Sequence, residues 1–367
     1  MGALEGIVRP EIAALVPYEP GKPVEELERE LGIEGAIKLA SNENPLGPSP
    51  RALEAARAAL SGMHRYPDGG SFRLRRRLAS HLGVAPEQVV LGTGADEILE
   101  LLVKAFVRPG DEVVYAWPSF AMYPIVTQGA GGKSVRVALD ARLVHDLTKL
   151  LAAVTSRTRL LFICNPNNPT GTSVGASELD AFVKALPAHV VLAIDEAYCE
   201  FARRRDFPRT IEWIARRPGT IVLRTFSKIY GLAGLRVGYG AGDAELVGYL
   251  ERARHPFNIN SVAQAAAEAA LDDVDHVTAT QRVNAQGVEY LTRELSALGI
   301  EVWPTDANFV LARAGGRATY ERLLREGVIV RPLEGFGLSE HVRITVGLPE
   351  QNERLVKALR RLRQEAA

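Results

Sequence analysis

The sequence predicts an α/β protein with a large lobe, a mostly parallel sheet flanked by helices, and a smaller α+β lobe. From residue 45 to about 270, apolar runs alternate with helical patterns, as a parallel sheet with crossover helices requires. Several runs are continuous in Val, Ile and Leu, which is typical of strands covered on both faces. With 367 residues, of which 47% are hydrophobic, the chain can build a core of this size.

Three regions are expected along the chain. Residues 1–44 form an N-terminal arm, rich in proline and charge, that contains a short helix over 24–31 and packs with the small lobe. Residues 45–270 form the large lobe, and residues 271–367 form the small one. The predicted elements of the small lobe are helices over 281–298 and near 319–326, and strands over 308–311, 328–330 and 342–346. We expect the functional site between the two lobes.

Composition argues against several classes of function. The net charge is zero and no basic stripe is present, so neither nucleic acid nor an anionic membrane surface is an expected partner. Charges interrupt every long apolar stretch, and residues 1–9 lack a secretory pattern, so no membrane span is expected. Only two cysteines, Cys164 and Cys199, occur, which fits a reducing cytoplasm. The histidines form no His-Glu-x-x-His motif, so no catalytic metal is expected.

The first candidate site is a turn of small residues, LGTGADE at 91–97. It follows an apolar run and opens a helical pattern over 97–106, so free backbone N–H groups at the helix start can bind an anion. The alternative is an ordinary strand-to-helix connection with an Asp cap. Glu97 stands where a dinucleotide fingerprint requires its third glycine, which excludes that motif.

Two further strands end in polar residues, CNPNNPTG at 164–171 and AIDEAY at 193–198. The carboxyl ends of parallel strands converge on one crevice, so Asn168, Asp195 and Tyr198 are expected to share a pocket. Taken separately, each segment also fits a plain turn or a capped loop.

The most informative run is TFSKIYGLAGLR at 225–236, at the end of another strand. A buried Lys228 beside the hydroxyl of Ser227 can hold an aldehyde cofactor as a Schiff base, with Arg236 eight residues later to meet its phosphate. A solvated surface lysine is the alternative for this motif alone.

Together these motifs resemble those of fold-type-I pyridoxal-phosphate aminotransferases. The likeness narrows to histidinol-phosphate aminotransferases through KLASNENPLGP at 38–48, YPDG at 66–69, GADE at 94–97, PFNIN at 256–260 and RITVG at 343–347. It extends from about Val8 to near the C-terminus.

The resemblance implies catalytic roles for several residues. Lys228 would bind pyridoxal 5'-phosphate and then move a proton between the substrate Cα and the cofactor. Asp195 would pair with the pyridine nitrogen, because a carboxylate favours the protonated ring. Tyr198 and Asn168 would hydrogen-bond the ring's phenolic oxygen, and Asn168 is also a candidate for substrate binding.

The same resemblance implies how the rest of the cofactor is held. The Ala95 and Asp96 amides, Ser227 and Arg236 would bind the phosphate. Phe120 would lie against the ring face, although core packing is the plainer interpretation of this residue.

Tyr66 would reach the phosphate in a neighbouring subunit's site, which implies a homodimer with shared active sites. This role comes from the resemblance alone, and an ordinary, half-exposed turn tyrosine is the alternative.

Substrate binding is expected from two arginines of the small lobe and one tyrosine of the arm. Strand alternation over 342–346 turns Arg343 away from the apolar face and toward the cleft, where a guanidinium can grip a carboxylate or phosphate. Arg331 is a second candidate, for which a surface salt bridge is the alternative. Tyr18 would add a hydrogen bond from the arm.

The resemblance implies transfer of an amino group between L-histidinol phosphate with 2-oxoglutarate and imidazole-acetol phosphate with L-glutamate, in histidine biosynthesis. An aromatic amino acid aminotransferase and a threonine-phosphate decarboxylase-like lyase remain alternatives from related enzymes. A non-catalytic, cofactor-sensing regulator is a third, but it expects an attached basic DNA-binding domain for which the chain has no room.

Overall fold

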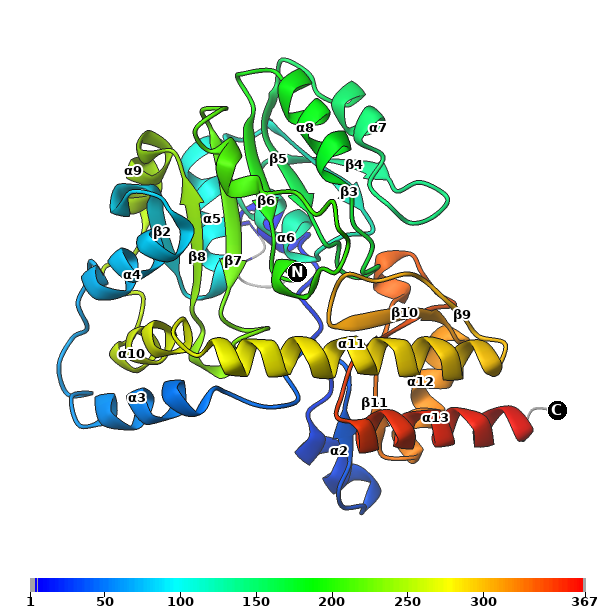
Figure 1. The fold of residues 1–367 in the computed structure, drawn as a ribbon. Coiled ribbons are helices and arrows are strands. Elements are labelled where there is room, and N and C mark those ends of the chain that lie inside the picture. The colour runs from blue at the N-terminus through cyan, green and yellow to red at the C-terminus, as the bar shows by residue number, and fades with distance from the viewer. Residues whose placement is uncertain (1–3, 5, 366–367) are drawn as a thin grey trace.

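The computed structural model describes residues 4 and 6–365, and its largest element is a seven-stranded sheet (Figure 1). The strand order is β2-β8-β7-β6-β5-β3-β4, and only β8 runs antiparallel to its neighbours. The strands are β2 (Val89–Gly92), β3 (Glu112–Trp117), β4 (Lys133–Ala138), β5 (Thr158–Cys164), β6 (Val191–Asp195), β7 (Thr220–Thr225) and β8 (Gly238–Gly242). The predicted α/β fold with a mostly parallel sheet is confirmed.

Helices cover both faces of this sheet, which explains why its strands are continuously apolar. In β5, Leu160 and Phe162 pack in one core with α5, α6 and α9, whereas Leu161 and Ile163 pack in another with α7 and α8. The bounds of these helices are α5 (Gly94–Phe106), α6 (Met122–Gly129), α7 (Leu147–Ala152), α8 (Ala176–Ala185) and α9 (Ala244–Ala253).

A second, antiparallel sheet has the order β12-β13-β10-β9 and its own hydrophobic core. Its strands are β9 (Glu301–Val302), β10 (Phe309–Arg313), β12 (Arg331–Pro332) and β13 (Val342–Thr345). The helices that follow the large sheet in this part of the chain are α11 (Val274–Ala297), α12 (Gly316–Arg325) and α13 (Pro349–Gln364). Figure 1 shows α11 running from the side of the large sheet to the small one, above α13.

One short strand of the N-terminal segment pairs with a strand from the C-terminal part of the chain. After α1 (Pro10–Ala13) and α2 (Val24–Leu31), β1 (Ile37–Lys38) pairs in parallel with β11 (Val328–Ile329) in a separate two-stranded sheet. A further layer beside the large sheet consists of α3 (Pro50–Leu60), α4 (Phe72–Leu82) and α10 (Ser261–Ala270), which pack on one another. The lobe boundaries near residues 44 and 270 stay predictions.

Two predicted helices differ from the observed ones at their starts. The long helix α11 begins at Val274 instead of residue 281, because Asp273 caps it by accepting a hydrogen bond from the His276 amide. Helix α5 begins at Gly94 instead of residue 97, so the predicted small-residue turn is itself the first helical turn.

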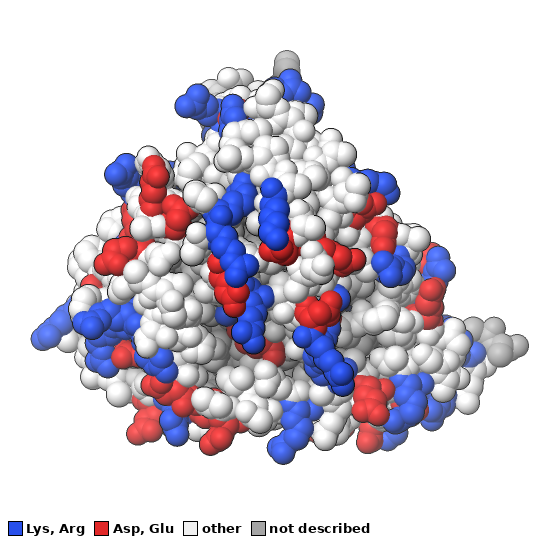
Figure 2. Space-filling view, turned by 45° about the horizontal axis from the view of Figure 1, so that its top comes forward, with Lys and Arg blue, Asp and Glu red and all other residues white. Residues whose placement is uncertain are grey.

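Basic and acidic side chains are interspersed over the face drawn in Figure 2, in keeping with the zero net charge. Within residues 4 and 6–365, no helix combines the length and the apolar character that crossing a membrane requires.

Candidate active site

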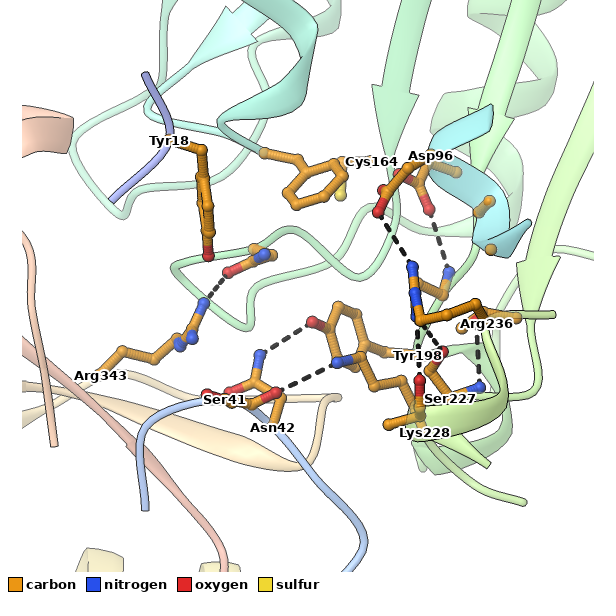
Figure 3. Close-up of a pocket in the computed structure, with 18 residues that line it drawn as sticks. Tyr18, Ser41, Asn42, Asp96, Cys164, Tyr198, Ser227, Lys228, Arg236 and Arg343 are labelled. Atoms are coloured by element: carbon orange, nitrogen blue, oxygen red, sulfur yellow. Dashed lines mark hydrogen bonds and ion pairs between the residues drawn. The ribbon is translucent and has the colours of Figure 1, made fainter. Parts of the chain in front are cut away.

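The strand ends of the large sheet meet β13 and the N-terminal segment around one cavity (Figure 3). Asn168 follows β5, Asp195 ends β6 and Lys228 follows β7, so parallel strands bring these side chains to the same edge. The predicted site residues that line the cavity are Tyr18, Ala95, Asp96, Phe120, Asn168, Asp195, Tyr198, Ser227, Lys228, Arg236 and Arg343. Tyr66 and Arg331 do not line it.

The Lys228 amine enters the cavity with a backbone carbonyl as its hydrogen-bond partner. Its Nζ donates to the Ser41 carbonyl at 3.2 Å and lies 6.0 Å from the centre of the Tyr198 ring. Burial, reinforced by the charge of Arg343, lowers the pKa of Lys228 from 10.5 to about 8. A lowered pKa increases the fraction of neutral amine, which is the form that attacks an aldehyde.

Asp195 is a buried carboxylate that lines the cavity. The Tyr123 hydroxyl donates to its Oδ2 at 2.8 Å, and the Ala197 amide donates to its Oδ1 at 3.2 Å. Burial raises the pKa of Asp195 to about 6, and the hydrogen bond from Tyr123 opposes that rise. In the described part of the chain no basic side chain pairs with it, so the carboxylate is free to pair with a cationic group in the cavity.

Tyr198 and Asn168 are buried side chains whose polar ends are already held in place. Asn42 Nδ2 donates to the Tyr198 hydroxyl at 2.8 Å, and the Arg343 guanidinium donates to Asn168 Oδ1. Both contacts come from segments outside the large sheet, so the second sheet and the arm help to fix the site.

An anion seat is present at the start of α5. The amides of Gly94, Ala95 and Asp96 lie in the first helical turn, where they have no intrahelical acceptor. Arg236 lies 3.5 Å from the Ser227 hydroxyl and 3.4 Å from Asp96. A Cβ at Gly94, whose φ is +73°, would lie 2.5 Å from Arg236 Nη2, so glycine lets the guanidinium approach the helix start. Amides, a hydroxyl and a guanidinium together suit a phosphate.

Two arginines lie directly opposite each other on neighbouring strands of the small sheet. Arg331 in β12 and Arg343 in β13 are cross-strand partners, and such side chains share one face. Arg343 is buried and donates to the Ala40 carbonyl at 2.6 Å, while Arg331 donates to the Glu19 carbonyl at 2.7 Å. Burial lowers the pKa of Arg343, and the charge of Arg331 adds to this, although Tyr198 and Tyr18 oppose it. Among the described residues neither arginine has a carboxylate partner, so the pair is suited to an anion.

Of the aromatic residues Tyr18, Phe120 and Tyr66, which were all predicted to belong to the site, two line the cavity and one lies on the surface. Tyr18 enters the cavity from the N-terminal segment (Figure 3), and the centre of its ring lies 5.5 Å from the Arg331 guanidinium carbon. Phe120 lines the cavity after β3 and meets the Tyr123 ring edge-on. Tyr66 is 84% exposed and stacks on Phe257, away from the cavity of its own chain.

Sequence reasoning missed three contributors to this site. The Ser41 carbonyl, the Asn42 amide and the Tyr123 hydroxyl contact Lys228, Tyr198 and Asp195 respectively. Ser41 and Asn42 lie in the motif at 38–48, which indicated the family but no role for either residue. Tyr123 had no signal of its own beyond its position three residues after Phe120.

This arrangement combines a lysine nucleophile, a free carboxylate and two separate anion sites. In the described range of the chain, no group of three or more His, Cys, Asp and Glu residues could hold a metal ion. The amine, the carboxylate and the anion-binding groups of the cavity suit a ligand that carries an aldehyde and a phosphate.

The fold and this cavity define the class I and II aminotransferases, and the family model "Aminotransferase class I and II" matches residues 34–359. A histidinol-phosphate aminotransferase of Nitrosococcus oceani is 48% identical over 96% of each chain. One of Moorella thermoacetica is 46% identical over 96% of this chain and 92% of its own. The crystal structure of histidinol-phosphate aminotransferase from Sinorhizobium meliloti in complex with pyridoxal-5'-phosphate superimposes with a TM-score of 0.90, at 32% identity and 98% coverage of both chains. The chain belongs to the histidinol-phosphate aminotransferase family.

Proposed function

We propose that this protein transfers an amino group from L-glutamate to imidazole-acetol phosphate, or in reverse from L-histidinol phosphate to 2-oxoglutarate, in histidine biosynthesis. The observation that carries the substrate class is the cross-strand pair Arg331 and Arg343, which has no acidic partner within residues 4 and 6–365. Both amino donors are anions, one a carboxylate and one a phosphate, so one arginine site serves both.

The residues of the cavity suit both the ring nitrogen and the phosphate of pyridoxal 5'-phosphate. Asp195 lacks a cationic partner in the described chain, as a carboxylate that pairs with a pyridinium nitrogen requires. The first turn of α5, Ser227 and Arg236 suit the phosphate, and Lys228 supplies the amine. When bound, the cofactor supplies an aldehyde that condenses with amines and a ring that accepts electrons from the substrate Cα.

The proposed roles of the protein groups follow from their positions. Lys228 would hold the cofactor through its amine and, when that amine is free, would move the proton at the substrate Cα, for which its lowered pKa is suitable. Asp195 keeps the ring nitrogen protonated, and Tyr123 holds the carboxylate in place. Tyr198 and Asn168 donate to the phenolic oxygen, and Phe120 packs against the ring.

The Arg331→Ala variant tests the substrate class. We expect the ratio of kcat/KM for histidinol phosphate over phenylalanine to fall at least about tenfold, because a charge-assisted contact to phosphate is lost. Arg313→Ala is the matched control, since Arg313 is an exposed residue of the same sheet that pairs with Glu301. An unchanged ratio, or a wild type that prefers phenylalanine, would favour the aromatic aminotransferase instead.

We also propose a homodimer in which Tyr66 completes the neighbouring site. Tyr66, Met63 and Phe72 are large side chains that are each at least 60% exposed, so a partner subunit could cover them. Arg236 is 46% exposed, so the anion seat has an open side from which a partner's hydroxyl could reach a phosphate.

Mixing inactive subunits tests the shared site. Lys228→Ala and Tyr66→Phe homodimers carry one defect in every site, whereas each heterodimer carries one site with both defects and one with neither. Equal mixing should restore about one native site in four. Mixing Lys228→Ala with a chain that carries both substitutions is the control and should restore nothing. Absence of recovery in the first mixture, with a monomeric sedimentation coefficient, would refute the dimer.

A cytoplasmic location completes the proposal. It is supported by Cys164 and Cys199, both of which are free thiols.

A further inference from the structure

Three consecutive residues of the N-terminal arm each hold a different side chain of the site. The Ala40 carbonyl accepts from Arg343. Figure 3 shows the other two contacts, in which the Ser41 carbonyl accepts from Lys228 and Asn42 donates to Tyr198. Only Asn42 does so with its side chain, so this contact depends on the identity of the residue.

The Asn42 side chain is fixed from several directions. Its backbone has a φ of 55°, in the left-handed region that asparagine tolerates better than most residues. Its amide N–H donates to Thr345 Oγ1 at 2.9 Å, and the Thr345 hydroxyl donates back to Asn42 Oδ1 at 3.1 Å. Asn308 Nδ2 donates to the Asn42 carbonyl at 3.0 Å. Because Oδ1 receives the Thr345 hydrogen, the Nδ2 donor must face Tyr198.

This orientation constrains the Tyr198 hydroxyl. A hydroxyl that accepts from Asn42 must direct its own hydrogen elsewhere. In residues 4 and 6–365 no acceptor receives that hydrogen, and the hydroxyl lies at the wall of the cavity. An asparagine donor therefore leaves the tyrosine as a donor toward the ligand.

We propose that Asn42 is a positioning residue that directs the Tyr198 hydroxyl hydrogen into the cavity, toward the phenolic oxygen of the cofactor. The inference rests on the proposed function, because it needs pyridoxal phosphate in this cavity. It also links the site to β13, since Thr345, which holds Asn42, lies two residues after Arg343 on that strand.

The test uses the visible absorbance of the cofactor-loaded protein as a function of pH, without any substrate. A hydrogen bond to the phenolic oxygen stabilises its anionic form, so its loss raises the midpoint pH of the absorbance change. Asn42→Asp replaces the donor by an acceptor that captures the Tyr198 hydrogen. We expect its midpoint to rise by about one pH unit, as in Tyr198→Phe.

The double variant separates positioning from the added charge. If Asn42 acts through Tyr198, the shift caused by Asn42→Asp becomes much smaller in the Tyr198→Phe background. Equal shifts in both backgrounds would overturn the proposal. Asn44→Asp is the matched control, because it places the same charge two residues away, where Asn44 bonds Ile229 and Thr280 instead of Tyr198.

A second pair of variants keeps the test valid if Asn42→Asp does not fold. Thr345→Val removes the hydroxyl that orients Asn42 and should raise the midpoint, whereas Thr345→Ser keeps the hydroxyl and should not. Identical midpoints for Val and Ser would contradict the proposal. A wild type that binds no pyridoxal phosphate would instead refute the proposed function, so the two failures are distinguishable.

Discussion

Replacing Lys228 by alanine is expected to abolish amino transfer while pyridoxal phosphate still binds. In the proposed site, the first turn of α5, Arg236 and Asp195 would hold the cofactor independently of the amine, so affinity should fall but not vanish. Borohydride treatment followed by peptide mass spectrometry should find the cofactor attached to Lys228 in the wild type and to no lysine in the variant. Lys184→Ala, on the exposed face of α8, is the control.

The pH dependence of attachment provides a further check on Lys228. Attack on the aldehyde needs the neutral amine, and the pKa of Lys228 is lowered to about 8. The rate at which the apoprotein takes up cofactor covalently should therefore rise with pH and level off above about pH 8, instead of continuing to rise toward 10.5. Normal turnover in Lys228→Ala would refute the proposal that the Lys228 amine is required for amino transfer.

Asp195→Asn is expected to slow the proton-transfer step by about a hundredfold or more, and to weaken cofactor binding. An amide is nearly isosteric with the carboxylate but does not keep the ring nitrogen protonated, so the ring loses its ability to accept electrons. Single-turnover rates with glutamate measure this step directly. Asp180→Asn, at an exposed pair with Lys184 on α8, controls for the loss of one charge.

The affinity for the cofactor should also depend on pH differently in the wild type and in Asp195→Asn. The pKa of Asp195 is raised to about 6, so the wild-type carboxyl becomes protonated as the pH falls through that value. Wild-type affinity should then decrease more steeply below pH 6 than that of Asp195→Asn. Near-wild-type rates in the variant would mean that Asp195 only caps its loop.

Much of this architecture could be predicted from the sequence because its signals are local. Continuous apolar runs that end in polar residues indicated which strands carry Asn168, Asp195 and Lys228. The helices Val24–Leu31 and Phe72–Leu82 have the periodicity and boundaries expected of amphipathic helices.

The contacts that could not be predicted from the sequence join residues that are far apart in the chain. Asn42 and Tyr198 are separated by 156 residues, and no local pattern indicates that they meet. The pairing of β1 with β11, outside the four-stranded sheet, is likewise a tertiary arrangement. The start of α11 was missed because the residues after its Asp273 cap lack a regular apolar pattern.

The most direct test of the proposed reaction follows one nitrogen atom. Holoenzyme is incubated with 15N-labelled histidinol phosphate and unlabelled 2-oxoglutarate, and the products are identified by mass spectrometry. We expect one labelled glutamate for each imidazole-acetol phosphate formed, without release of carbon dioxide. Labelled ammonia, carbon dioxide release, or no labelled glutamate from histidinol phosphate while phenylalanine does yield it, would contradict the account.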